Sequence, residues 1–311
     1  MSISDEITRL KNAKNAIKTS IEAKGVTVSD TAKLDEYSTL IDSIPTSGSS
    51  TSDNYWANYM DIKLNNTKAS YLFGYLNPTG YETECVNKIE NIDTSNFTDI
   101  SFILFGFNSQ FPSATIDSLD VSNWDISNVR HSSFTSAFAN IEVGTFNMKN
   151  WVFPDNADLY SLFANSDITK IDITGTDFSN VKSINSTFRR ISNLTEIVGE
   201  IDCSNLSNGV YSASYYNPFD SDKKLSKLYL KNIYKDITIT DNDKYSINLG
   251  QTIVCDECLV YIINQLPNLI TDKGLTTVTK ITLTLPATNT LTEEQVKVAT
   301  DKGWLVKNTT Y

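Results

Sequence analysis

The sequence predicts an α+β protein with three parts: an N-terminal helical module, a central solenoid of short repeats and a C-terminal α/β cap. The main observation is a recurring phrase, in which an apolar-polar-apolar triplet, one intervening residue, an asparagine and a large apolar residue follow one another. The asparagines stand at positions 96, 123, 150, 205 and 232, so their spacings are 27, 27, 55 and 27 residues. A fixed period in this range predicts a solenoid. Helix-like patterns before and after the repeats predict the flanking modules.

Residues 1–45 are expected to form the helical module. Apolar residues at alternating spacings of four and three form a heptad seam that one lysine interrupts. The seam consists of Ile3, Ile7, Leu10, Lys14, Ile17 and Ile21. Two interpretations stay open: the helix packs on a second helix as a monomeric hairpin, or the seam self-associates and makes a homo-oligomer. Isoleucine favours three strands, whereas the lysine favours a defined register or a lower order.

A second helix is expected to start at the capping residues Ser29 and Asp30 and to stop at Pro45. Its apolar face would hold Leu34, Tyr37, Ile41 and Ile44. Residues 46–53, with the sequence TSGSSTSD, follow it. Their small polar composition predicts a flexible linker.

Residues 54–251 are assigned to the repeats. Because side chains alternate along a strand, the outer residues of each triplet are expected to face the core and the middle residue to face solvent. The middle residues should therefore form a row on the concave sheet. Neighbouring residues of the row would be about 4.8 Å apart, one from each repeat unit, or rung, of the solenoid. These candidate partner-binding residues are Asp93, Asp120, Asn147, Asp172, Asp202 and Tyr229.

Like charges opposed on neighbouring strands repel, so a cation, a basic partner or neighbouring donors are expected to relieve this row. Two interpretations follow: a partner or Ca²⁺ site, or a hydrated polar face hydrogen-bonded to adjacent loops. Isolated aspartates rarely supply the six or more oxygens that calcium prefers. No metal ligands are therefore assigned.

Each repeat has a second apolar segment after its strand, with helix-like spacing, which is expected to pack the convex side. These segments end at Phe105, Phe138, Phe163 and Phe188. The recurring asparagine is interpreted as a scaffold residue, whose amide satisfies backbone groups at the turn that leaves the strand. The triplet Ile62-Lys63-Leu64 has the same form and would be the first rung.

Residues 252–311 are expected to form an α/β cap that covers the last open rung. One helical face, an alternating strand over residues 280–285 and a capped helix over residues 293–302 predict it. Thr292 and Gln295 form the capping box of that helix, and Gly303 ends it. The helical face is made by Leu259, Ile262, Ile263 and Leu266.

Composition limits the classes of partner. The chain has 26 Lys and Arg against 37 Asp and Glu, and the resulting net charge of −11 disfavours nucleic acid and anionic bilayers. No stretch approaches the ~20 apolar residues of a spanning helix, so no membrane insertion is expected. The N-terminal residues lack a basic region followed by an apolar one, so no secretory signal is expected.

No pattern of residues predicts catalysis or a cofactor, and the chain is expected not to be an enzyme. The one histidine, His131, follows Arg130 in an expected loop and is interpreted as a solvated residue. Cys255 and Cys258 have the spacing of a redox motif, but no thioredoxin-like strand pattern surrounds them, and zinc would need two more ligands. We interpret them as ordinary reduced thiols near a helix start.

A tyrosine-rich stretch is a second candidate contact region. It contains Tyr211, Tyr215 and Tyr216. Tyrosine rings in such a stretch either stack on the sugars of a glycan or fill the caps and loops of the repeats.

The residues LDVSNWDISNV, from Leu119 to Val129, closely resemble the BspA-type leucine-rich repeat of bacterial and mycoplasma surface proteins, which also occurs in bacteriophage gene products. The usual continuation of that repeat is a short helix ending in Met-Phe. Here the first residue of that pair is Ala137, Leu162 or Thr187. The strand at residues 281–285 and the segment LTEEQVKVATDKGW also resemble the terminator of this repeat group. The resemblance implies a leucine-rich-repeat solenoid.

Residues 7–44 resemble the helical leader of many phage virion proteins, especially tail-associated and fibre-like ones. Together the resemblances imply a virion structural protein, assembled in the host bacterial cytoplasm. Its leader would dock on other virion proteins or oligomerise, and its repeats would project as a fibre-like appendage from tail, baseplate or head toward a host-surface glycan or protein. The alternatives are a decoration protein that stabilises the particle without a host ligand, and a cytoplasmic interaction scaffold.

Overall fold

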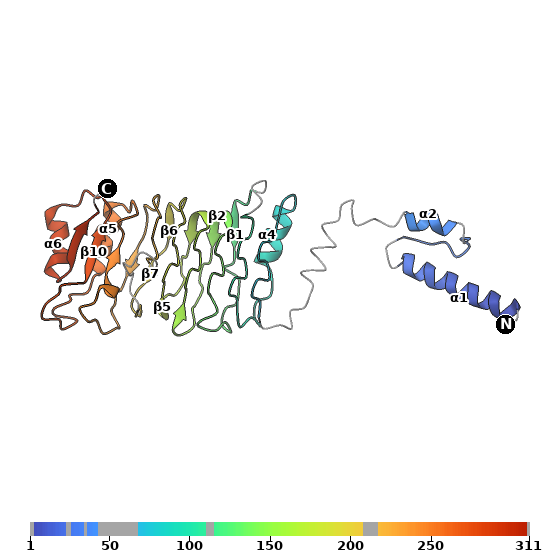
Figure 1. Ribbon diagram of the computed structural model, residues 1–311, viewed down its shortest axis with the longest axis horizontal. Coiled ribbons are helices and arrows are strands. Elements are labelled where there is room, and N and C mark those ends of the chain that lie inside the picture. Colours follow the sequence, from blue (N-terminus) through green and yellow to red (C-terminus); the bar gives the residue numbers. More distant parts are fainter. Residues whose placement is uncertain are drawn as a thin grey trace. The chain divides into compact units, whose positions relative to one another are not determined.

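The computed structural model describes residues 3–22, 26–33, 36–42, 68–109, 115–207 and 217–309. The chain divides into two units, Met1–Lys63 and Leu64–Tyr311 (Figure 1). The linker predicted over residues 46–53 and the first rung predicted at residues 62–64 lie outside the described residues.

The N-terminal unit contains helix α1 (Ile3–Glu22) and the short helix α2 (Tyr37–Asp42). The first predicted helix is confirmed, but the second begins later than predicted. Ser29 and Asp30 lie in a turn, where the Ser29 hydroxyl accepts a hydrogen bond from the Thr31 N–H. Such local bonds compete with helix formation, so Ser29 ends up in a turn and not at a helix start.

A small core packs the C-terminal end of α1 against α2 and the segment between the two helices. Ile21, Val28, Ala32 and Tyr37 are buried together, and Val26 and Leu40 pack against them. The packing supports the hairpin interpretation at the C-terminal end of α1, because Ile21 of the seam is used there.

In the larger unit, short parallel strands joined by long turn segments lie side by side (Figure 1). Its largest sheet has the order β1-β2-β4-β6, from β1 (Ser118–Asp120), β2 (Glu142–Asn147), β4 (Asp167–Asp172) and β6 (Glu196–Val198). Ser118 pairs with Thr145 and Glu142 with Asp167, which are 27 and 25 residues further on. The 27-residue offset equals the period of the repeated phrase, and the phrases at Leu119, Phe146 and Ile171 each contribute to a strand of this sheet.

Two smaller parallel pairs and one helix complete this part of the stack. Strand β3 (Ala157–Asp158) pairs with β5 (Val181–Ser183), and β7 (Ile201–Asp202) pairs with β8 (Leu230–Lys231). Helix α4 (Glu82–Glu90) lies beside β1, where the Trp124 indole N–H donates to the Ile89 carbonyl at 2.9 Å. The helix thereby covers the Trp124 indole of the repeat that contains β1.

Burial in the strands follows the predicted alternation. In the triplets at Leu119, Phe146, Ile171, Ile201 and Leu228, both outer residues are buried and the middle residue is half-buried. The scaffold role predicted for the asparagines is seen at Asn205, whose amide donates to the Ser179 carbonyl at 2.6 Å, whereas the Asn232 amide donates to the Asp202 carboxylate at 2.7 Å.

The helices expected on the convex side are absent from the described residues, and turns take their place. Two residues in each turn segment have a left-handed backbone, such as Ser161 (φ 56°) and Asn165 (φ 59°). Alternate N–H groups there point to the next rung: Phe138 donates to Leu162, and Phe163 donates to Thr187. The prediction of a helix was wrong because these bonds run between rungs, whereas helical bonds run along the chain.

The phenylalanines of these turns form a buried column. Ring centroids lie 5.4 Å apart for Phe138 and Phe163, and 5.9 Å apart for Phe163 and Phe188. Phe105 does not belong to the column: Leu104 donates to Ala137 as Phe138 does to Leu162, so Leu104 is the equivalent residue, and Phe105 is half-buried.

The C-terminal elements include those predicted from residue 252 on, together with two elements from residues that were assigned to the repeats. They are η2 (Asp243–Tyr245), β9 (Ile247–Asn248), α5 (Asp256–Gln265), β10 (Thr282–Leu285), α6 (Glu293–Asp301) and β11 (Leu305–Asn308). The three strands form a parallel sheet in the order β11-β10-β9. The capping box of Thr292 and Gln295 is present, and Gly303 has a φ of 88° just after α6.

Candidate functional site

The predicted polar row runs along the sheet over three strands and then breaks. Asp120 pairs with Asn147, and Asn147 pairs with Asp172. The next partner of Asp172 is Val198, not Asp202. The row was therefore predicted correctly from Asp120 to Asp172 and wrongly beyond Asp172, and Asp93 lies outside the named strands.

A second departure from the predicted row is a two-residue change of register between the following strands. Glu196 bridges Lys227, an offset of 31 residues, whereas Ile201 pairs with Leu230, an offset of 29. The extra residues lie around Gly199, which has a φ of 107°. As a result Asp202 pairs with Lys231, and Tyr229 does not stand beside it as the phrase alignment predicts.

Each aspartate of the row accepts a hydrogen bond from the N–H two residues further on. The pairs are Asp93 with Ser95, Asp120 with Ser122, Asp172 with Thr174 and Asp202 with Ser204. These are Asx turns, in which the carboxylate shapes the chain as it leaves the strand. Hydrogen bonds from Ser95 lower the pKa of Asp93. Neighbouring donors are thus one of the three predicted ways by which the charges of the row are relieved.

Lysines relieve the remaining charge of this face. Lys149 lies 3.2 Å from Asp172, and Glu196 lies between Lys170 at 3.6 Å and Lys227 at 3.1 Å. Burial alone would raise the pKa of Asp172, but hydrogen bonds from Thr174 and Lys149 outweigh it and lower that pKa. Among the residues that the structure describes, no group of three Asp, Glu, His or Cys side chains is placed to hold a metal ion.

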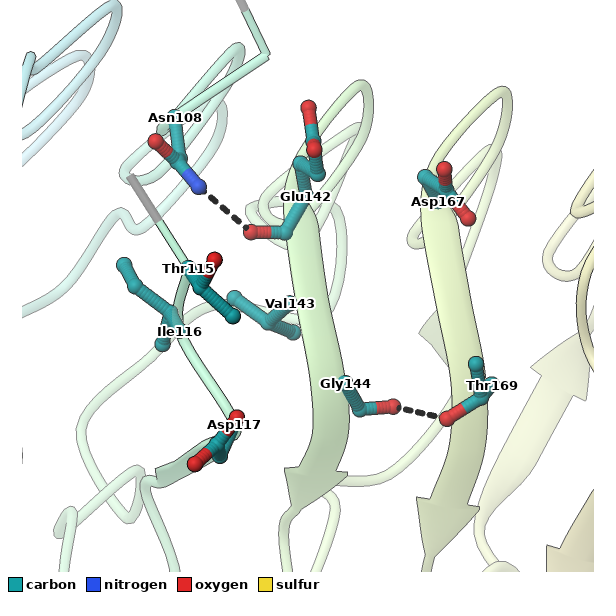
Figure 2. Close-up of a pocket in the computed structure, with 9 residues that line it drawn as sticks. All are labelled: Asn108, Thr115, Ile116, Asp117, Glu142, Val143, Gly144, Asp167 and Thr169. Atoms are coloured by element: carbon teal, nitrogen blue, oxygen red, sulfur yellow. Dashed lines mark hydrogen bonds between the residues drawn. The ribbon is translucent and has the colours of Figure 1, made fainter. Parts of the chain in front are cut away.

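A shallow acidic pocket lies beside the starts of β2 and β4 (Figure 2). Its cavity of about 220 Å³ is lined by Asp117, Glu142 and Asp167, with Gly144 and Thr169 deeper along the strands. The Thr169 hydroxyl donates to the Gly144 carbonyl at 2.6 Å. Burial and the nearby Asp167 raise the pKa of Glu142. The lining offers acceptors for a cationic group, but no nucleophile paired with a base.

An exposed aromatic cluster was missed by the sequence reasoning. Tyr71 and Tyr75 are 52% and 50% exposed. Tyr71 stacks on Phe102 with ring centroids 4.7 Å apart, and Phe105 meets Tyr71 and Tyr75 edge-on at 6.3 and 5.5 Å. Tyr71, Tyr75 and Phe102 have φ between 58° and 60°, at turn positions where later rungs carry serine, asparagine or arginine.

A local sequence signal for this cluster does exist. Gly106 occupies the turn position equivalent to Tyr75, and a Cβ there would lie 2.7 Å from the Tyr75 ring. The glycine therefore makes room for the ring. Large aromatic side chains in a left-handed backbone are rare and costly, which points to a function for the cluster.

The residues of the α1 seam differ in their exposure to solvent. Ile7, Leu10 and Ile17 are 48%, 48% and 40% exposed, whereas Ile21 is buried in the hairpin core. Lys14 lies 5.9 Å from the centre of the Tyr37 ring. The side chain of Ile3 lies outside the described residues.

The remaining candidates carry no catalytic arrangement. His131 is exposed, and its carbonyl accepts a backbone hydrogen bond from Asp158. Tyr229 is half-buried and packs edge-on against Tyr261 at 5.3 Å. Tyr211, Tyr215 and Tyr216 lie outside the described residues. In the described part of the chain, no helix is long and apolar enough to cross a membrane.

Comparisons with known proteins add no family. No protein-family model matches the chain, and neither a curated protein nor a solved structure matches it. The class that the structure itself defines is a chain of two units, of which one is a helical hairpin and the other a stack of parallel strands with mixed helices.

Proposed function

We propose that this chain is a non-enzymatic structural protein of a bacteriophage virion, with a leucine-rich-repeat type of solenoid that projects from the particle as a fibre-like appendage. The single observation that carries the proposal is that the two units differ in where their apolar residues are exposed. One unit presents exposed apolar residues at heptad spacing on α1, and the other stacks rungs with most of their apolar residues buried. The first suits attachment or self-association, and the second suits display of a surface.

The exposed part of the α1 seam is the proposed oligomerisation and docking face. Ile7, Leu10 and Ile17 lie on one side of the helix, and Lys14 lies among them. A homo-oligomer formed there would leave Ile21 in its own hairpin core. The attachment partner on the particle would be another virion protein.

The test of this face is the solution mass of the full chain, measured by sedimentation equilibrium. We expect a dimer or trimer, and a monomer for a chain that starts at Asp53. An I7S/L10S/I17S variant should also be a monomer, because it removes the exposed seam and leaves Ile21 in place. The matched control N12S/N15S/T19S changes the opposite side of α1 and should keep the parent mass. A monomeric full chain would count against oligomerisation through this seam.

The host-contacting surface is proposed at the exposed aromatic cluster of Tyr71, Tyr75, Phe102 and Phe105. Flat tyrosine rings with exposed faces suit stacking against sugar rings of a surface glycan. The charged sheet face carries its own lysine-carboxylate pairs and is a weaker candidate.

Labelled full chain added to a panel of bacterial strains separates the alternatives. A receptor-binding protein should attach to cells, a decoration protein should bind only phage particles, and a cytoplasmic scaffold should bind neither. A Y71S/Y75N variant, which installs residues that later rungs carry, should lose most cell binding. Tyr160→Ser is the control, because Tyr160 is 40% exposed but lies outside the cluster. Unchanged binding by the cluster variant would show that the aromatic cluster is not the host-contacting surface.

A further inference from the structure

Two cysteines meet at the start of helix α5. Cys255 is the residue that precedes the ten-residue helix, and Cys258 lies in its first turn. Their Sγ atoms are 2.7 Å apart, with the Cys255 thiol donating toward Cys258. A disulfide requires the two sulfur atoms to come together at short range, and this contact already brings the two Sγ atoms close to bonding distance.

The two sulfurs differ in accessibility. Cys255 is half-buried and reachable from solvent, whereas Cys258 is fully buried. Burial raises the pKa of the Cys258 thiol, and the neighbouring Cys255 adds to that effect. An accessible first cysteine and a shielded second one form the arrangement that thiol-disulfide exchange uses.

The backbone around the pair is held from the preceding rung. The Ser226 carbonyl accepts the Cys255 N–H at 2.9 Å and lies 3.8 Å from the Cys258 sulfur. The Tyr229 hydroxyl also borders Cys258, and its hydrogen bond with that sulfur raises the pKa of Tyr229 to about 12. These contacts fix the first turn of α5 before any bond forms.

The other two cysteines lie in other elements, and neither is accessible to solvent. Cys85 lies in α4 and Cys203 follows β7, and both are buried. Burial raises the pKa of Cys85 to about 11 and that of Cys203 further still. They therefore serve as internal controls for thiol reactivity.

We propose that Cys255 and Cys258 are a redox-active dithiol that closes to an intramolecular disulfide by exchange with a small disulfide such as oxidised glutathione. The Cys255 thiolate attacks one sulfur of glutathione disulfide, which forms a mixed disulfide and releases one glutathione thiolate. Cys258 then loses its proton and attacks the Cys255 sulfur, which releases the second glutathione thiolate. The chain is oxidised by two electrons, and one glutathione disulfide becomes two glutathione molecules after protonation.

The test equilibrates the full chain in mixtures of reduced and oxidised glutathione, quenches with acid and labels free thiols with N-ethylmaleimide after denaturation. Mass spectrometry should count four labels in reducing mixtures and two in oxidising ones, and peptide mapping should place the lost labels on residues 255 and 258. Four labels in every mixture, disulfides between chains, or loss of labels at Cys85 or Cys203 would overturn the proposal.

Two single variants test the order of attack. Cys258→Ser should trap glutathione on Cys255, because no second thiol can resolve the mixed disulfide. Cys255→Ser should stay unmodified, because Cys258 is buried. Cys203→Ala is the control and should still lose two labels on oxidation. Equal glutathione adducts on the two serine variants would contradict the assignment of Cys255 as the attacking thiol, and circular dichroism checks that each variant is folded.

Discussion

At the scale of single residues, the turn segments depend on side chains that tolerate a left-handed backbone. Ser136, Ser161 and Ser186 occupy one such position in successive rungs, with φ between 51° and 56°. A left-handed conformation costs an ordinary residue about 1–2 kcal/mol. The inter-rung hydrogen bonds of the same segments offset this cost. Each rung is thus stable only in contact with the next.

Gly144 gives a residue-level prediction about the close approach of two rungs. A Cβ at this position would lie 2.5 Å from the backbone oxygen of Asp117. We expect Gly144→Ala to lower the free energy of unfolding by about 1–3 kcal/mol, because backbone must move to remove the clash. Gly74→Ala is the control, since its nearest neighbour would be the Tyr71 ring at 3.3 Å. Urea unfolding measures both, and equal losses would contradict the role of the Asp117 contact.

Asp222 gives a prediction about pH. Its carboxyl group is buried, Oδ1 accepts the Ile191 N–H at 2.8 Å, and Oδ2 has no hydrogen-bond partner among the described residues. Burial raises the pKa of Asp222 well above its usual value. A raised pKa gives stability that is complete below the unfolded pKa and is lost as pH rises through the folded one.

Asp222→Asn removes this titration. The variant should therefore gain stability relative to the parent as pH rises above about 4, by at most ~1.4 kcal/mol per pH unit. Urea unfolding at pH 3, 5 and 7 measures the difference between the two proteins. A difference that does not change with pH would show that Asp222 titrates normally in the folded chain.

At the scale of elements, the helices differ in how they are held at their ends. Helix α6 starts with a complete capping box, whereas α5 starts at Cys255 without a side-chain cap. The start of α5 is instead fixed by Ser226 of the preceding rung. Helix α1 contributes Ile21 to its own unit and leaves Ile7 exposed. The two ends of α1 thus lie in different surroundings.

The capping box of α6 gives an element-level prediction. Thr292→Ala removes the hydroxyl that accepts the Gln295 N–H at 3.3 Å, and we expect a loss of about 1 kcal/mol. Thr300→Ala, an exposed position near the end of the same helix, should change stability by less than half as much. Thermal unfolding compares the two variants, and similar losses would argue against the cap.

At the scale of the whole molecule, the chain separates into two units whose stability has different sources. The hairpin unit depends on a few residues around Ile21 and Tyr37. The larger unit buries apolar residues from nearly every rung and links rungs by backbone hydrogen bonds. Such a stack owes its stability to contacts between neighbouring repeats.

Limited proteolysis tests the boundary between the units. Residues 46–53, whose small polar composition predicts a linker, should be cut first by a protease of broad specificity. Mass spectrometry should then find a fragment that contains residues 68–309 and persists through the digestion. A first cut between strands β1 and β8 would contradict the expected order.

Several parts of the fold follow from local pattern and could be predicted. Alternation placed Leu119 and Val121 inside and Asp120 outside, and the Thr292 capping box located α6. The turn segments could not be predicted in the same way. Their apolar spacing fits a helix, and only the bonds from Phe138 and Phe163 to the next rung select turns.

For the candidate sites, the sequence by itself determined the polar row from Asp120 to Asp172, the spacing of the α1 seam and the place of Cys255 and Cys258 near a helix start, because each follows from spacing along the chain. Tertiary structure decided where the row breaks, since Asp172 pairs with Val198 and Asp202 pairs with Lys231. It also decided that Ile21 is buried while Ile7 is exposed, and that Tyr71, Tyr75, Phe102 and Phe105 form one cluster. The physical reason is that register and exposure depend on contacts between segments about 30 residues apart, which no local pattern records.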